Sequence, residues 1–177
     1  MDSPQQVNLL SCENVSKAFG ERPLLRDVSL GVSKGERIGV VGRNGAGKST
    51  LLRVLSGAEP PNSGRVTRGA SVVVGELDQV GTSAEHATIR SHVLGDRDEH
   101  DWAGDSAVRE ILTALLGGFQ SEQLDRRISD LSGGERRRAY LAEQLIREVD
   151  VLFLDEPTNH LDVEIIAWLA AHLKGRP

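Results

Sequence analysis

Residues 42–50 read GRNGAGKST and follow an apolar run at 38–41. This spacing matches the phosphate-binding pattern G-x-x-x-x-G-K-[ST], set between a predicted buried strand and the helix-forming residues 51–55. The glycines let successive backbone N–H groups point into one concavity, and the helix that begins there adds the positive end of its dipole. The loop therefore predicts binding of a nucleoside triphosphate, by Gly42, Arg43, Asn44, Gly45, Ala46, Gly47, Lys48, Ser49 and Thr50.

Two side chains of this loop have a specific chemistry. Lys48 can reach the terminal phosphates, and the Ser49 hydroxyl is placed to ligate Mg²⁺. The alternative is a glycine-rich loop with a chance lysine. Four specified positions match by chance in about one chain of this size in a hundred, so we favour the phosphate site.

Two carboxylates, Asp155 and Glu156, follow the apolar residues 151–154. A strand buried on both faces offers no partner for charge, so these acids are expected at its carboxyl end, where ligands gather in α/β sheets. There Asp155 would hold Mg²⁺ or its bound water, and Glu156 would orient and deprotonate the attacking water. Acids that merely end a strand are the alternative, and a nearby phosphate loop disfavours it.

A second anion-binding helix start is predicted at residues 131–135, which read LSGGE. Ser132 is a predicted N-cap, and Gly133 and Gly134 leave backbone N–H groups uncovered at the positive end of a helix. A cap needs only Ser132, so the two glycines suggest that a phosphate approaches closely. One triphosphate needs only one such helix start. The second helix start therefore indicates a composite site shared between two copies or two domains.

The remaining patterns predict an α/β chain. Residues 7–30 are β-like, with a turn at Gly20, and residues 65–74 form further short strands. An acidic stretch at 95–104, which includes Trp102, is predicted to be a solvated loop. Alternating strands and helices indicate a largely parallel sheet, with a small antiparallel piece at the front and a helical piece in the middle. The predicted helices cover residues 83–93, 105–116, 133–147 and 162–173.

Composition narrows the class of protein. The chain has 177 residues, enough for one domain, and a net charge of −5, which gives no global reason to expect bare nucleic acid as a ligand. A single cysteine, Cys12, fits a reducing compartment. No apolar stretch approaches the roughly 20 residues of a membrane span, and residues 1–6 do not begin a secretion signal. These features predict a cytoplasmic protein that does not itself insert into a membrane.

The three motifs GRNGAGKST, LSGGE and VLFLDEP, in that order, resemble those of ABC-type ATPase domains. The resemblance covers nearly the whole chain. It implies a P-loop NTPase fold of the ABC type, with a mainly parallel sheet core, a small antiparallel β-subdomain and a helical subdomain at about 84–147. It also implies hydrolysis of ATP with Mg²⁺. In that family the signature, here Ser132, Gly133, Gly134 and Glu135, closes over the γ-phosphate held by an opposing domain.

The resemblance also implies roles for three further residues. Gln79 looks like the glutamine that bridges Mg²⁺ and the water to the helical subdomain. Phe19 looks like the aromatic residue that stacks on adenine, although a lone Phe between short strands is as often part of a core. Asp162 looks like the loop aspartate that crosses the dimer interface.

The residues Asn159 and His160, before Leu161 and Asp162, are similar to the ABC-F subfamily. Its members carry two ATPase cassettes in one chain and act on ribosomes, in translation or in antibiotic resistance. Transporter cassettes more often carry small residues there, and the ATP-binding subunit of a membrane transporter is the alternative. The three arginines at 136–138 have two interpretations: a solvated helix face, or a contact with RNA or the partner domain.

One departure from the family bears on the length of the chain. ABC cassettes carry a switch histidine at the end of a further strand, whereas His160 and His172 fall in a loop and in a predicted helix. We therefore expect residues 1–177 to be the first cassette of an ABC-F protein, incomplete at its C-terminus. Its partner would be a second cassette, in the same full-length chain or in a homodimer mate. Alone, the chain should bind ATP and hydrolyse it weakly.

Overall fold

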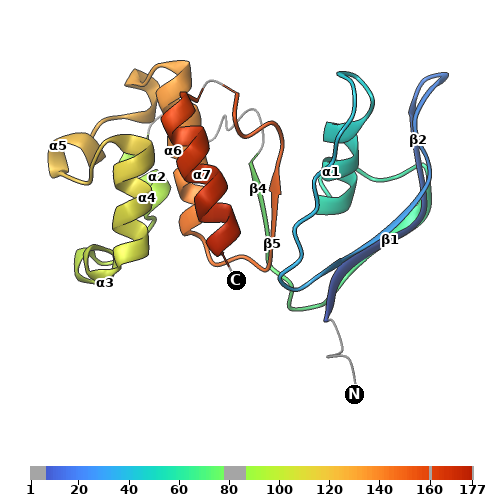
Figure 1. The fold of residues 1–177 in the computed structure, drawn as a ribbon, viewed down its shortest axis with the longest axis horizontal. Coiled ribbons are helices and arrows are strands. Elements are labelled where there is room, and N and C mark those ends of the chain that lie inside the picture. The colour runs from blue at the N-terminus through green and yellow to red at the C-terminus, as the bar shows by residue number, and fades with distance from the viewer. Residues whose placement is uncertain (1–6, 78–86, 160, 177) are drawn as a thin grey trace. The chain divides into compact units, whose positions relative to one another are not determined.

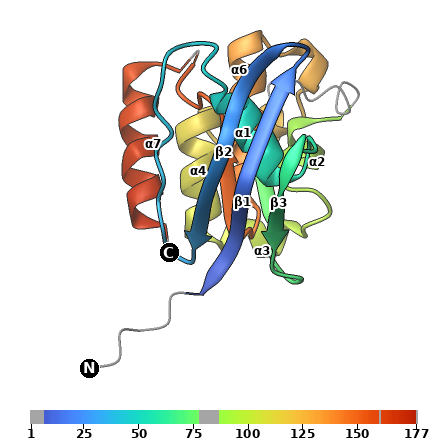
Figure 2. The same ribbon diagram turned by 90° about the vertical axis from the view of Figure 1, so that its right-hand side faces the viewer.

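Two antiparallel strands of 12 residues each, β1 (Asn8–Phe19) and β2 (Arg22–Ser33), form a long hairpin (Figures 1 and 2). The computed structural model describes residues 7–77, 87–159 and 161–176. Gly20 has a φ of +60° at the hairpin turn, as the sequence predicts. Strand β3 (Ser63–Arg68) pairs with the other edge of β1, giving the order β2-β1-β3. The predicted antiparallel piece is confirmed, with longer strands than expected.

One helix packs on this sheet and completes a core. The helix α1 (Lys48–Ser56) buries Leu51, Val54 and Leu55 against residues of β1 and β2 such as Leu10. Two short strands, β4 (Val74–Leu77) and β5 (Val151–Leu154), pair with each other in a second sheet. Phe153 of β5 belongs to the same core. These elements make up the first of two units, which spans Met1–Glu76 and Val149–Asp155.

The strand predicted at 38–41, before the phosphate loop, is not formed. These residues belong to neither sheet, and Ile38 is 48% and Val41 is 93% exposed. An apolar run has the propensity for a strand, but a strand exists only where a neighbour supplies its hydrogen-bonding partners. Within the described residues, β4 and β5 pair with each other and leave this run without such a partner.

The second unit, Leu77–Glu148 with Glu156–Pro177, is helical. Its core lies between α4 and α6 and includes Leu112, Leu115 and Leu141. Asp105 caps the N-terminus of α4 by accepting from the N–H groups of Ala107 and Val108. The helices are α2 (Ile89–Val93), α3 (Glu99–Gly104), α4 (Ser106–Leu116), α5 (Ser121–Leu124), α6 (Gly133–Ile146) and α7 (Val163–Gly175), with a 3₁₀ turn, η2 (Ile128–Asp130).

The acidic stretch predicted as a loop at 95–104 contains the helix α3, so that prediction is wrong in part. Trp102 is only 4% exposed, packs edge-on against Phe119 and lies under the guanidinium of Arg90. Burial of this large ring outweighs the polar composition around it. Glu99 and Asp101 lie in the first turn of α3, where the helix dipole favours acids.

The other predicted helices are present. The helix predicted at 83–93 begins, within the described residues, at Ile89, and Gly117 ends α4 in the left-handed conformation. No helix in the described ranges is both long and apolar enough to span a bilayer.

Candidate functional site

The phosphate loop at residues 42–50 follows residues 38–41, which form no strand, and leads into α1. Gly45 and Gly47 have φ angles of +76° and +95°, which side chains other than glycine rarely adopt. Gly47 is the N-cap of α1, and a Cβ atom there would lie 3.2 Å from the carbonyl oxygen of Leu24. Both the conformation and the close approach therefore require glycine at Gly47.

The charged and hydroxyl side chains of this loop are exposed or half-buried, so a ligand can reach them. The Lys48 ammonium donates to the carbonyl oxygens of Gly42 at 3.0 Å and Arg43 at 3.3 Å, so it lies over the loop. Residues 42–46 and Ser49 are exposed. Backbone N–H groups at a helix start and an ammonium above them suit a polyphosphate.

The end of the β1–β2 hairpin lies beside this loop. Phe19 pairs with Arg22 across the hairpin, and the Arg22 guanidinium lies 3.5 Å from the carbonyl oxygen of Gly45. Phe19 is 53% exposed, with the Lys17 ammonium 5.3 Å from its ring centroid. The core alternative for Phe19 is therefore wrong. Stacking on a nucleotide base stays a prediction, and Arg22 is a neighbour of the loop that the sequence did not indicate.

Asp155 directly follows β5 and is partly buried. It belongs to the same unit as Ser49, and a hydroxyl with a carboxylate is an oxygen donor set that suits Mg²⁺. Within the described residues no three His, Cys, Asp or Glu side chains gather as a metal centre. Phosphate and water oxygens would thus have to complete the coordination. Gln79, the other predicted metal contact, lies outside the described residues.

Glu156 has an unusual backbone conformation, with a φ of +45°. Its carbonyl oxygen accepts from the Arg137 guanidinium at 2.7 Å and from the Asn159 N–H at 3.1 Å. Its carboxylate accepts from the Asn159 side-chain amide at 2.5 Å. Neither Arg137 nor Asn159 was predicted as a partner of Glu156. The φ angle and these contacts are visible only once the chain is folded.

The signature residues begin α6. The Ser132 hydroxyl accepts from the Glu135 N–H, and the Glu135 carboxylate accepts from the Ser132 N–H at 2.9 Å, which is a reciprocal cap. That backbone bond, then the Ser132 hydroxyl and Arg126, lower the pKa of Glu135 to about 2. A Cβ atom added at Gly133 would meet open space. Folding therefore gives no reason for glycine at Gly133. Its contact with the phosphate of a partner domain stays a prediction.

The three arginines that follow the signature do not form a solvated helix face, so that alternative is wrong. All three are half-buried, and each donates to a backbone carbonyl of the same unit. Arg136 contacts Leu131, Arg137 contacts Glu156, and Arg138 contacts Leu115. Their contact with RNA or a partner domain stays a prediction.

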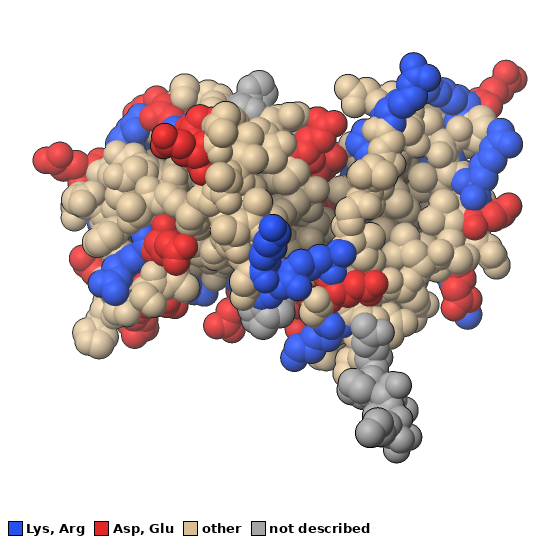
Figure 3. All heavy atoms as spheres, viewed as in Figure 1, with Lys and Arg blue, Asp and Glu red and all other residues tan. Residues whose placement is uncertain are grey.

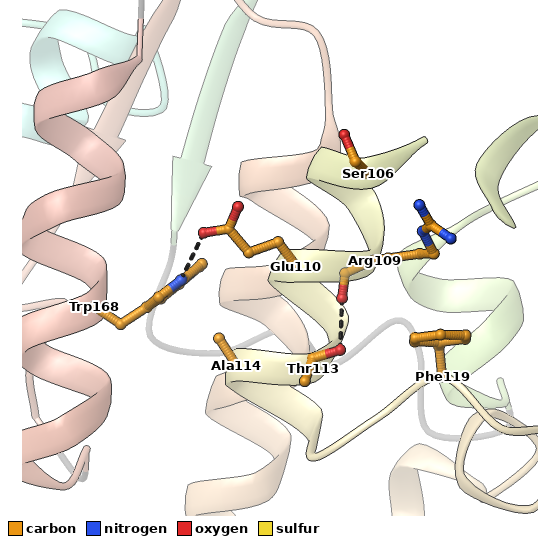
Figure 4. Close-up of a pocket in the computed structure, with 7 residues that line it drawn as sticks. All are labelled: Ser106, Arg109, Glu110, Thr113, Ala114, Phe119 and Trp168. Atoms are coloured by element: carbon orange, nitrogen blue, oxygen red, sulfur yellow. Dashed lines mark hydrogen bonds between the residues drawn. The ribbon is translucent and has the colours of Figure 1, made fainter. Parts of the chain in front are cut away.

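The helical unit also contains Asp162 and a pocket. Asp162 caps α7 by accepting from the Ile165 N–H at 2.9 Å. A pocket of about 530 Å³ between α4 and α7 is lined by seven residues, none of them a predicted site residue (Figure 4). On the face shown in Figure 3, basic and acidic side chains are interspersed. That face has no extensive surface of one sign.

A family model described as ABC transporter matches residues 25–159. The chain belongs to this ATPase family. Membership confirms the predicted ABC-type P-loop fold, and it implies nucleotide binding and ATP hydrolysis.

Curated relatives give a more specific likeness. The chain is 41% identical to the energy-dependent translational throttle protein EttA of Haemophilus influenzae, over 91% of this chain and 29% of that protein. It is 39% identical to EttA of Escherichia coli K12, with the same two coverages. The chain thus spans less than a third of the length of these relatives.

Solved structures show the same fold. The ATP-binding subunit of an ABC transporter superposes with a TM-score of 0.76, over 94% of this chain and 73% of that one, at 21% identity. At this identity the likeness concerns the fold alone.

Proposed function

We propose that the chain is the first ATP-binding and ATP-hydrolysing cassette of an ABC-F protein that acts on the ribosome. The observation that carries this proposal is the identity of up to 41% with proteins named translational throttles. The residues Asn159 to Asp162 support the same subfamily. The alternative, the ATP-binding subunit of a membrane transporter, is favoured only by a likeness of fold. A ribosomal role, in translation or in antibiotic resistance, implies a cytoplasmic protein that contacts ribosomal RNA.

In this proposal residues 42–50 bind the triphosphate of ATP and Phe19 stacks on the adenine. Lys48 exchanges its two loop carbonyls for phosphate oxygens, which are stronger acceptors for an ammonium. Ser49, Asp155 and Gln79 would hold Mg²⁺. The metal would supply charge stabilisation for the phosphoryl group that is transferred.

Glu156 is the proposed base that orients and deprotonates the attacking water. The signature of a second cassette would close over the γ-phosphate, and the signature of this chain, Ser132 to Glu135, would do the same for its partner. Asp162 would lie at the interface between them. Residues 84–147 would be the helical subdomain of the cassette. Because catalysis here depends on positioning and charge, the chain without its partner should hydrolyse ATP weakly.

The proposal is tested with the full-length protein that carries this cassette. Replacing Glu156 with Gln should preserve ATP binding, abolish hydrolysis at this site and hold the protein on ribosomes when ATP is present. Cosedimentation with purified ribosomes measures this, with a Lys48→Ala variant as the control that cannot bind ATP. Copurification with membrane-spanning subunits and no ribosome binding would support the transporter alternative instead.

A further inference from the structure

Glu156 is held in a conformation that its residue type does not favour. Its φ of +45° lies in the left-handed region, and Pro157 restricts it further. The other described non-glycine residues with positive φ are Asn14 and Asp27, types that tolerate this region. Backbone conformations of this kind are strained and persist only where surrounding contacts hold them.

Two residues supply those contacts: Arg137 at the backbone of Glu156, and Asn159 at both its backbone and its carboxylate. Arg137 donates to its carbonyl oxygen at 2.7 Å, which fixes the peptide plane. Asn159 donates its backbone N–H to the same oxygen at 3.1 Å, closing a tight turn, and its side-chain amide to Oε2 at 2.5 Å. Both the backbone and the carboxylate of Glu156 are thereby oriented.

We infer that Arg137 and Asn159 are positioning residues for Glu156 in ATP hydrolysis. This inference rests on the proposed function, in which Glu156 is the base. Arg137 fixes the backbone of Glu156, from which the side chain projects, and Asn159 fixes the position of its carboxylate. A base must lie within hydrogen-bonding reach of the water it deprotonates, so a small displacement of the carboxylate slows the reaction.

The position of Arg137 in α6 gives this arrangement a second consequence. Arg137 lies one helical turn after Gly133, the first residue of the helix. The same rigid turn therefore carries the signature glycine and holds the backbone of Glu156. A phosphate bound by the signature of this chain and the base of this chain are connected through a single helical element.

The neighbouring arginines provide the matched control. Arg136 and Arg138 are also half-buried on α6 and also donate to carbonyl oxygens, but those belong to Leu131 and Leu115. Removing Arg138 should therefore cost stability as removal of Arg137 does, without disturbing Glu156. Asn159 is exposed, so Asn159→Asp should fold; it keeps the side-chain shape and replaces the amide donor with a second carboxylate.

The experiment uses the full-length protein, with the corresponding catalytic glutamate of the second cassette replaced by Gln so that one site is read. Arg137→Ala and Asn159→Asp should each lower kcat about 10- to 100-fold with KM for ATP unchanged. Arg137→Lys should recover part of the loss, because an ammonium can still donate to the carbonyl. Arg138→Ala should keep kcat within about twofold of the parent.

The inference is overturned if Arg137→Ala and Asn159→Asp keep the parental kcat while Glu156→Gln abolishes turnover. It is also overturned if Arg138→Ala lowers kcat as much as Arg137→Ala, because the effect would then be a general loss of helix packing. If Glu156→Gln itself hydrolyses ATP normally, the proposed base is wrong, and that result identifies the failure as one of the proposed function.

Discussion

At the scale of single residues, Gly47 and Gly133 both begin helices but are glycine for different reasons. Gly47 needs its positive φ, and a side chain would press on Leu24. Gly133 meets open space and has an ordinary helical conformation. Folding explains the first glycine but not the second, for which contact with a partner's phosphate is the predicted reason.

This difference predicts opposite effects of the same substitution. Gly47→Ala should lower the free energy of unfolding by about 1–3 kcal/mol. Gly133→Ala should change it by no more than about 0.5 kcal/mol, while hydrolysis in the full-length protein falls because a methyl group obstructs the partner's phosphate. Denaturant unfolding and ATPase assays measure the two effects. Full activity of Gly133→Ala would contradict the proposed composite site.

The exposure of Phe19 leads to a second prediction. Because its ring is half-exposed, Phe19→Ala should leave the free energy of unfolding within about 0.5 kcal/mol of the parent. Loss of a stacked base should weaken ATP binding by about 1–2 kcal/mol, roughly 5- to 30-fold in Kd, measured by calorimetry. Phe153→Ala is the control, since it removes a core ring and should destabilise the fold by about 3–5 kcal/mol. An unchanged Kd for Phe19→Ala would exclude the stacking role.

The sequence predicts some of these residues and not others for a physical reason. The phosphate loop, the signature and the carboxylate pair each consist of residues that are adjacent in the sequence, so each can be predicted from a local pattern. Arg22 contacts a residue 23 positions away, and Arg137 one 19 positions away. Such partners depend on strand register and helix packing, which one sequence does not specify.

At the scale of elements, the start of α6 depends on an ionised Glu135. Its folded pKa of about 2 lies below the ordinary value of 4.5, because the Ser132 N–H, the Ser132 hydroxyl and Arg126 all favour the charged form. A depressed carboxyl pKa contributes stability above the unfolded value. That contribution is lost as pH falls from about 4.5 towards about 2.

Glu135→Gln should therefore change the response to acid. A glutamine can still accept in the reciprocal cap, but it cannot lose a charge. The parent should lose more unfolding free energy than the variant between about pH 7 and pH 3, measured by denaturant titration at each pH. Glu122→Gln, at an exposed position in α5, is the control and should follow the parent. Equal losses in the parent and Glu135→Gln would show that another group carries the acid response.

Element types were easier to predict than element surroundings. Ser132 caps α6 as predicted. Asp105 and Asp162, at the starts of two predicted helices, and Gly117, at the end of one, are local signals of the same kind. The loop prediction for residues 95–104 was wrong in part because burial of Trp102, a tertiary effect, favours a helix there.

At the scale of the whole molecule, the order of strands and helices and the α/β class follow from periodicity. The segment at 38–41 shows where that reasoning fails. Its composition is that of a buried strand, yet Val41 is 93% exposed. Periodicity describes the conformation that a segment prefers, whereas a strand also requires a second segment to pair with. The pattern of one segment does not identify that pairing partner.

The distribution of chromophores divides the molecule in another way. Trp102, Trp168 and the single tyrosine, Tyr140, all belong to the helical unit. Emission excited in the near ultraviolet therefore reports on that unit, while the sheet and phosphate loop contribute no signal of their own. A melting curve recorded by this fluorescence therefore measures unfolding of the helical unit and does not detect unfolding of the phosphate loop. A fluorophore placed on the β1–β2 hairpin would make both halves visible in one titration.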